Sequence, residues 1–170
     1  MKEFSNKKYI NVYLGLGSNI GDRAENLRSA ARLIEKNVGK IAKKSRFYET
    51  QPWGKTDQDP FYNQVLMINT TLEPREVLDK ISRIERELGR ERKEQWGPRI
   101  IDIDILFYGK WVVRDKGLEI PHPEIQDRGF VLVPMMEISG EFEHPVLKKA
   151  IDELYMDCKD MSDVVDLGIN

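Results

Sequence analysis

Apolar residues along the chain follow two different periods, and the change from one to the other predicts the order of strands and helices. Residues 9–17, YINVYLGLG, are rich in β-forming side chains and stop at glycines, which is typical of a strand. Over residues 24–38 the apolar positions recur at a helical spacing, and Gly39 provides a stop. We expect a second strand over residues 41–48 and a long third one over 61–72.

The following stretch repeats this alternation of elements. Pro74 suits the first turn of a helix, whose apolar stripe ends before Gly89. A basic loop follows, and residues 100–107, IIDIDILF, alternate as a strand does. The order strand, helix, strand, strand, helix, strand predicts an α+β fold, the ferredoxin-like split βαβ sandwich. In this fold two helices cover one face of an antiparallel sheet, so we expect the ligand site on the other face.

C-terminal additions follow this core. After Gly109 we expect a short hairpin or loop, the segment IPHPEIQDRGFVLVPMMEI, and a last helical pattern from Val146. Residues 157–170 are polar and acidic and are expected to form a loosely held end. Without an internal repeat or a linker, residues 1–170 are predicted to form a single domain with a motif-bearing core at about 9–138.

The composition narrows the classes of protein. Charged residues make up 33% and hydrophobic ones 40%, which is ordinary for a globular protein. The net charge of −2 argues against a broad nucleic-acid-binding surface. Cys158 is the only cysteine, and neither a signal-peptide pattern nor a membrane-length apolar run is present. We therefore expect a cytoplasmic protein with no membrane or nucleic-acid partner, and a monomer, although a dimer stays open.

The strand IIDIDILF carries two acids in an otherwise apolar run. Alternation places Asp102 and Asp104 on one face and the neighbouring isoleucines on the other, towards a core. Side chains two apart on a strand lie roughly 6–7 Å from each other. One interpretation is a half-solvated strand with an acidic outer face. The other is a site for a hard cation such as Mg²⁺, which prefers oxygen ligands.

The loop of residues 89–99, GRERKEQWGPR, holds four basic residues and two acids. A charged loop is usually only solvated. Beside a carboxylate pair, however, arginines are what phosphate chemistry requires, because they clamp phosphate oxygens while Mg²⁺ offsets the charge. The glycines and Pro98 also fit a lid that closes over a substrate.

Other positions are candidates for binding a flat ligand. Phe61 and Asn63 lie two apart and would present an aromatic plate and an amide on a common side, and Arg128 and Phe130 share that spacing. Residues 15–19, GLGSN, lack the spacing of a phosphate-binding loop and are interpreted as a tight turn with local hydrogen bonds.

Together these segments resemble the 6-hydroxymethyl-7,8-dihydropterin pyrophosphokinase family. The matching pieces, in order, are YLGLGSNIGDR, ETQPWG with DPFYNQV, GRERKEQWGPRIIDIDILFYG and IPHPEIQDRGFVLVPMMEI. The combination of WGPRxxDxDIL with a later PHP and DRGFVL is highly specific. The resemblance implies transfer of the β,γ-diphosphate of ATP to the hydroxymethyl group of the pterin, with release of AMP, in folate biosynthesis.

The resemblance also implies roles for individual residues. Asp102 and Asp104 are expected to hold two Mg²⁺ ions on ATP, and Arg90 and Arg99 to be the catalytic arginines of the loop. The residues expected to bind ATP are Glu85, Arg92, Lys93, Arg99, Ile105, His122 and Arg128. Those expected to bind the pterin are Thr50, Gln51, Trp53, Phe61, Asn63 and Phe130, with the two phenylalanines stacked on its ring. Trp53 and Trp96 would lie on loops that close over the site.

Two rival functions use the same acidic pair or the same fold. A metal-dependent nucleotidyl- or glycosyltransferase can use a DxD pair, but it leaves the two phenylalanines and Asn63 unexplained. A non-catalytic ligand-binding module on a ferredoxin-like scaffold would need neither Mg²⁺ nor the formation of AMP.

Overall fold

The computed structural model describes residues 7–52, 56–91 and 95–170. Within them the main sheet has six strands, with β5, β1, β4, β3 and β8 in that order and β2 also paired to β4. Its strands are β1 (Ile10–Ser18), β2 (Lys40–Lys44), β3 (Tyr48–Thr50), β4 (Phe61–Thr70), β5 (Asp102–Tyr108) and β8 (Val164–Asp166). A separate hairpin joins β6 (Val113–Asp115) to β7 (Leu118–Ile120). The helices are α1 (Arg23–Asn37), α2 (Pro74–Glu87), α3 (Gly129–Ser139) and α4 (Ile151–Asp157), with a 3-10 turn at Ile125–Asp127.

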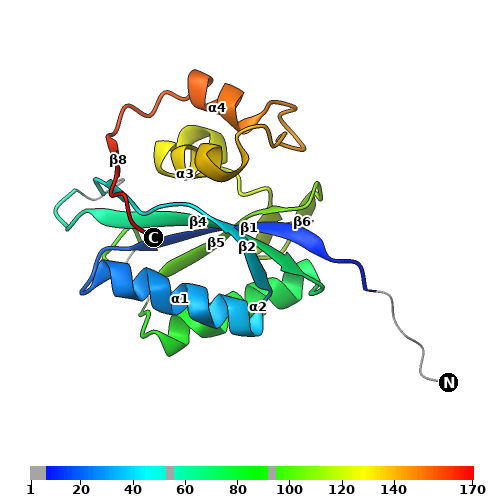
Figure 1. Cartoon of the computed structure of the whole chain (residues 1–170), viewed down its shortest axis with the longest axis horizontal. Helices are drawn as coiled ribbons and strands as arrows, with labels where there is room; N and C mark the ends of the chain where they lie inside the picture. Colours follow the sequence, from blue (N-terminus) through cyan, green and yellow to red (C-terminus); the bar gives the residue numbers. More distant parts are fainter. Residues whose placement is uncertain (1–6, 53–55, 92–94) are drawn as a thin grey trace.

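The expected split βαβ core is confirmed. The strand pairs of the main sheet are all antiparallel in the described part of the chain, and α1 and α2 lie together on one of its faces (Figure 1). The helical apolar stripes account for this packing, because Leu27 and Ile34 of α1 and Ile81 of α2 are fully or almost fully buried with Leu14 of β1. Burial of such side chains supplies most of the driving force for this layer.

The opposite face of the sheet is only partly free. Helices α3 and α4 cover part of it, as the two helical layers on either side of the sheet in Figure 1 show. A second core forms there, where Leu132 and Met135 of α3 and Ile151 of α4 pack with Phe107 of β5. Helix α3 is apolar almost all round, and such a helix is stable only when it is buried between neighbours. The C-terminal additions therefore restrict the ligand site to the remaining part of this face.

The prediction of a single strand over residues 41–48 is wrong. The chain pairs with β4 as β2, leaves strand geometry after Lys44 and resumes at Tyr48 as β3. Ser45 explains the break, because its Oγ accepts a hydrogen bond from the Val65 amide at 3.0 Å in place of a backbone carbonyl. A side-chain acceptor of this kind competes with the regular ladder.

The last helix begins later than expected, at Ile151 and not at Val146. His144 accounts for the later start. The Nδ1 atom of its ring accepts hydrogen bonds from the amides of Val146 and Leu147, each at 3.1 Å, and holds these residues in a turn before the helix. Both of those apolar side chains are exposed, so their spacing is not that of a buried helical stripe.

The tail expected to be loosely held is in part a strand of the sheet. Strand β8 pairs with β3, with Val164 opposite Thr50 and Asp166 opposite Tyr48. Part of the acidic end, including Asp166, therefore lies on an ordered edge strand. No helix in the described residues has the length and apolar character needed to cross a bilayer.

Candidate active site

Two adjoining cavities lie on the open part of the sheet face that α3 covers. The first, which we call the inner cavity, has a volume of about 90 Å³, and its lining includes Gly17, Thr50, Gln51, Phe61, Asn63 and Phe130. The second, the outer cavity, has a volume of about 530 Å³, and its lining includes Arg90, Glu91, Gln95, Gly97, Pro98 and His122. Five residues line both: Trp96, Arg99, Asp102, Asp104 and Arg128.

The two aspartates lie where the alternation of β5 predicts. Ile103 and Ile105 are buried in the core under α1 and α2, while Asp102 and Asp104 line the two cavities on the other face. Their cross-strand partners on β1 are glycines, Gly17 opposite Asp102 and Gly15 opposite Asp104. With no side chain on the neighbouring strand, the space in front of the two carboxylates is left open.

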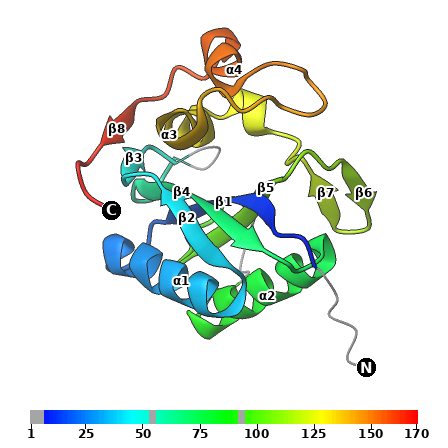
Figure 2. The same cartoon turned by 45° about the vertical axis from the view of Figure 1, so that its right-hand side comes forward.

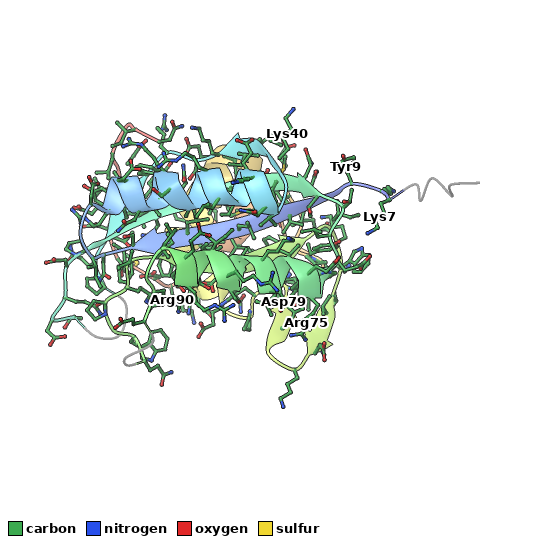
Figure 3. All side chains as sticks on the ribbon, turned by 90° about the horizontal axis from the view of Figure 1, so that it is seen from below. Lys7, Tyr9, Lys40, Arg75, Asp79 and Arg90 are labelled. Carbon is green, nitrogen blue, oxygen red and sulfur yellow. The ribbon has the colours of Figure 1, made fainter. Side chains whose placement is uncertain are left out.

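Asp102 is held between the two arginines expected to be catalytic. Its Oδ1 lies 2.8 Å from Nη1 of Arg90, and its Oδ2 lies 2.9 Å from Nη1 of Arg99. Arg90 also pairs with Glu85, a buried residue near the end of α2. Figure 3 shows Arg90 at the end of that helix farther from Arg75. The end of α2 and the loop after it thus bring the guanidinium groups of Arg90 and Arg99 to one carboxylate.

The environment of Asp104 disfavours its charge. Burial, followed by the nearby charge of Asp102, raises its pKa to about 7, and Arg128, Arg90 and Arg99 oppose this only in part. A cation brought by a ligand would therefore be favoured at this carboxylate.

The donor set in these cavities fits Mg²⁺ shared with a phosphate ligand. No group of three or more His, Cys, Asp or Glu side chains in the described part of the chain could enclose a metal ion by itself. Mg²⁺ is commonly bound by one or two carboxylates plus substrate phosphates, and not by an all-protein cage. Asp102 and Asp104 offer two such carboxylates on one strand face.

The inner cavity has an aromatic ring from each of two elements. Phe61 comes from β4 and Phe130 from α3, and each ring has an arginine beside it. The guanidinium carbon of Arg99 lies 5.7 Å from the Phe61 ring centroid, and that of Arg128 lies 5.6 Å from the Phe130 centroid. The two rings and their arginines therefore connect the apolar part of the site to its charged part.

The polar wall of the inner cavity is built from neighbouring strands. The amide nitrogen of Asn63 donates a hydrogen bond to Thr50 Oγ1 at 2.7 Å, and both residues are buried. This bond orients the amide, so that its carbonyl oxygen lies 3.3 Å from the position that a Cβ on Gly17 would take. Gln51 follows Thr50 and also lines the cavity.

His122 is held in one orientation at the outer cavity. Its backbone amide donates to Leu106 O at 3.0 Å, and its Nδ1 accepts a hydrogen bond from the Glu124 amide at 3.2 Å. Burial, and next the charge of Arg128, lower its pKa. The neutral ring therefore carries its proton on Nε2, which can donate to an anionic ligand.

Not every expected residue reaches the site. The side chain of Ile105 is buried in the core on the opposite face of the sheet and lines neither cavity, so its contact with adenine stays a prediction. Trp53, Arg92 and Lys93 lie outside the described residues. Trp96 lines both cavities in a left-handed backbone conformation, with a φ of 63°. The roles of the other residues remain predictions.

Asn19 holds together two segments at the site, although the sequence suggested only a local turn. Its Nδ2 donates to Gln58 Oε1 at 2.8 Å, and its Oδ1 accepts from the Arg99 amide at 2.8 Å. Gln58 in turn donates to the carbonyl oxygen of Trp96 at 2.7 Å. The end of β1 therefore joins the loop before β4 to the loop that carries Arg99. Only the contact of distant segments reveals this, because no local pattern marks it.

These features define a class of enzyme. Paired carboxylates, several arginines and a histidine that can donate a hydrogen bond surround one cavity, and an aromatic slot adjoins it. This combination is suited to phosphoryl-type transfer from a nucleotide, in which positioning and charge stabilisation do most of the work.

Comparison with known proteins identifies the family. Residues 13–140 match the model of 7,8-dihydro-6-hydroxymethylpterin-pyrophosphokinase (HPPK). The chain is 44% identical over 142 residues to the 2-amino-4-hydroxy-6-hydroxymethyldihydropteridine pyrophosphokinase of Aquifex aeolicus, covering 84% of this chain and 88% of that one. The enzyme of the same name from Bacillus subtilis is 41% identical over 143 residues, with coverages of 84% and 86%.

Solved structures support the fold. A Plasmodium falciparum HPPK-DHPS structure superposes with a TM-score of 0.74 at 22% identity and covers 91% of this chain. This chain spans only 45% of that two-part protein. The chain belongs to the 7,8-dihydro-6-hydroxymethylpterin-pyrophosphokinase family. It is an ATP-dependent enzyme of folate synthesis that transfers a pyrophosphoryl group to the hydroxymethyl pterin.

Proposed function

We propose that the inner cavity binds 6-hydroxymethyl-7,8-dihydropterin, that the outer cavity binds the triphosphate of ATP, and that the β,γ-diphosphate passes between them. In this reaction the hydroxymethyl oxygen forms a bond to the β-phosphorus and loses its proton to water, the bond from that phosphorus to the bridging oxygen of the α-phosphate breaks, and AMP leaves with that oxygen. One observation carries the proposal: Arg99, Asp102, Asp104 and Arg128 line both cavities, so the two substrates would meet at these side chains.

The pterin ring lies between Phe61 and Phe130, where stacking adds to burial of its faces. Asn63 and the chain at Thr50 and Gln51 bind its polar edge. The orientation of the Asn63 amide supports this role, because its bond to Thr50 holds it in place before a ligand binds. A site prepared in this way loses little side-chain entropy when the substrate binds.

Phosphate oxygens of ATP compete with Asp102 for its two arginines. Arg90 and Arg99 both pair with this carboxylate, and each can make the same charge-assisted hydrogen bonds to phosphate. When Arg90 and Arg99 exchange Asp102 for phosphate oxygens, both guanidinium groups therefore bind the transferred group. Arg128 and Nε2 of His122 bind further phosphate oxygens, and Glu85 lies beside Arg90, near the nucleotide.

Asp102 and Asp104 hold Mg²⁺, and we propose two ions. When bound, Mg²⁺ neutralises phosphate charge and favours the in-line displacement. The raised pKa of Asp104 supports this assignment, because it shows a carboxylate whose negative charge is incompletely balanced by the protein. A monomer located in the cytoplasm is the further prediction for the whole chain.

An AMP-release assay tests the proposal. We expect AMP only when ATP, Mg²⁺ and the hydroxymethyl pterin are all present, with the pterin diphosphate formed in equal amount. Each component is omitted in turn, and pterin without its hydroxymethyl group serves as the matched control. Formation of ADP, or equal AMP release with the control pterin, would contradict the proposed transfer.

A further inference from the structure

The last residues of the chain contact two elements that contribute to the lining of the inner cavity, β3 and α3. We call residues 158–170 the C-terminal strap; it follows α4 and lies beyond the residues 13–140 that match the family model. Strand β8 of the strap lies beside β3, as Figure 2 shows. Asp160, which precedes β8 in the strap, contacts Gly129 at the start of α3. Strand β3 ends at Thr50 and α3 carries Phe130, so the strap contacts two elements that line this cavity.

Asp160 of the strap completes the N-terminus of α3. Its Oδ2 accepts a hydrogen bond from the Gly129 amide at 3.0 Å, while its Oδ1 accepts one from the Ser162 amide at 3.0 Å. The first amides of a helix have no partner within the helix, and Arg128, which precedes α3, provides no side-chain cap. A carboxylate at this position also interacts favourably with the helix dipole. Asp160 thus caps α3 from a distant part of the chain.

The rest of the strap is fixed to the sheet. The Phe47 amide donates to Ile169 O at 2.7 Å, and the Leu167 amide donates to Phe47 O at 3.0 Å. Asp166 lies 2.9 Å from Arg46 in an ion pair. Because β8 is anchored to β3 in this way, the position of Asp160 is tied to the sheet and not only to the helix that it caps.

We infer that the C-terminal strap positions the pterin-binding end of α3, and that Asp160 is the positioning residue that does so. The inference rests on the proposed function, in which Phe130 and Arg128 bind substrates. Phe130 is the second residue of α3, so fraying of the first turn moves its ring relative to Phe61. Asp160 itself touches neither substrate, and its effect passes through the start of α3.

Three variants of the full chain test this inference: Asp160→Ala, Asp160→Asn and Asp163→Ala. Replacing a capping Asp with Ala removes both acceptors, whereas Asn keeps one oxygen that can still accept from the Gly129 amide and gives up the bond from Ser162. Asp163 is an exposed acid of the same strap, and Asp163→Ala removes the same charge as a matched control. For Asp160→Ala we expect the KM for the hydroxymethyl pterin to rise about fivefold. We expect the KM for ATP to stay within about twofold, since most of the outer cavity comes from other elements.

Hydrogen exchange at the amides of residues 129–132 separates local fraying from general destabilisation. In Asp160→Ala we expect exchange there to quicken about fivefold while the core strands keep their protection. Asp160→Asn should change both values less than Asp160→Ala does, and Asp163→Ala should leave both near those of the unchanged chain. Unchanged exchange at these amides, or faster exchange without a change in the KM for the pterin, would overturn the inference. If the unchanged chain released no AMP, the proposed function itself would fail, whatever the exchange data show.

Discussion

The inner and outer cavities are neighbours, yet they are built in opposite ways. The inner cavity is lined mainly by strand residues, and apart from the charged side chains that it shares with the outer cavity its polar groups are neutral, with Asn63 hydrogen-bonded to Thr50. The outer cavity is lined by charged side chains, several from the segment before β5, and these are held by ion pairs such as Asp102 with Arg99. Ion pairs can exchange partners with an anionic ligand, whereas a buried amide held by a strand cannot easily turn. The difference suits a flat neutral ring on one side and a polyphosphate on the other.

The largest expected effect follows from removing one charge at the boundary between the cavities. We expect Asp104→Asn to lower kcat by about 10³-fold or more, because the carboxylate that binds the metal is lost. Release of AMP at saturating Mg²⁺ and ATP measures this. Asp115→Asn, in the β6–β7 hairpin, is the matched control and should leave kcat unchanged. Near-normal turnover of Asp104→Asn would rule out the proposed metal site.

The second largest effect is expected from the substitution of Arg99. We expect Arg99→Ala to lower kcat about 10²-fold with a smaller change in the KM for ATP, because charge on the transferred group is most demanding in the transition state. Single-turnover measurements of AMP formation locate the loss in the chemical step. Arg83→Ala, on the exposed side of α2, is the control. An effect on ATP affinity alone would show that Arg99 only binds the nucleotide.

Gly17→Ala is expected to affect the inner cavity alone. The added Cβ would lie 3.3 Å from Asn63 Oδ1, so the Asn63 amide must shift slightly, and 3.6 Å from Phe61 Cδ1, which is an ordinary contact. A displaced polar contact commonly costs about 1.4 kcal/mol, so we expect the KM for the pterin to rise about tenfold with an unchanged KM for ATP. Gly15→Ala would meet Leu106 only, at 3.4 Å or more, and should have a smaller effect. Equal changes in both KM values would contradict separate cavities.

Gln58→Ala should instead affect both cavities. It removes the hydrogen bonds that join Asn19 and Trp96 across the two loops, so both lose a common support. We expect kcat/KM to fall about fivefold for each substrate, because two part-buried hydrogen bonds of about 0.5 kcal/mol each are lost. Asp57→Ala, an exposed change in the same loop, is the control. A loss confined to one substrate would show that the loops act independently.

The smallest expected effect concerns stability, measured without ATP or metal. The pKa of Asp104 is raised to about 7, so the folded chain holds this proton more tightly than the unfolded chain does. The free energy of unfolding therefore falls as pH rises from about 4 to 7. In this range the Asp104 carboxyl group is ionised in the unfolded chain but still protonated in the folded chain. Asp104→Asn removes this cost, and at pH 8 we expect a Tm higher by about 2–4 °C for each kcal/mol of the cost, with little difference at pH 4. A lower Tm for the variant at pH 8 would contradict the unfavourable charge.

Much of the fold could be predicted because its elements carry strong local periods. The alternation in IIDIDILF placed Asp102 and Asp104 on one face, and the structure confirms that placement. The predictions failed where a single side chain interrupts a period, as Ser45 does between β2 and β3 and His144 does before α4. Composition also misled at the C-terminus, because an acidic segment can still pair as an edge strand when its neighbour offers free backbone groups.

The sequence by itself determined which residues alternate, which helices are amphipathic and which family the motifs resemble. Each of these depends on short-range order along the chain, which a single sequence displays directly. Only the tertiary structure decided that Asn19 meets Gln58 and Arg99, that the Ile105 side chain lies in the core and in neither cavity, and that Asp160 caps α3. A hydrogen bond depends on distance in space, and the packing of the whole chain sets that distance for residues far apart in sequence.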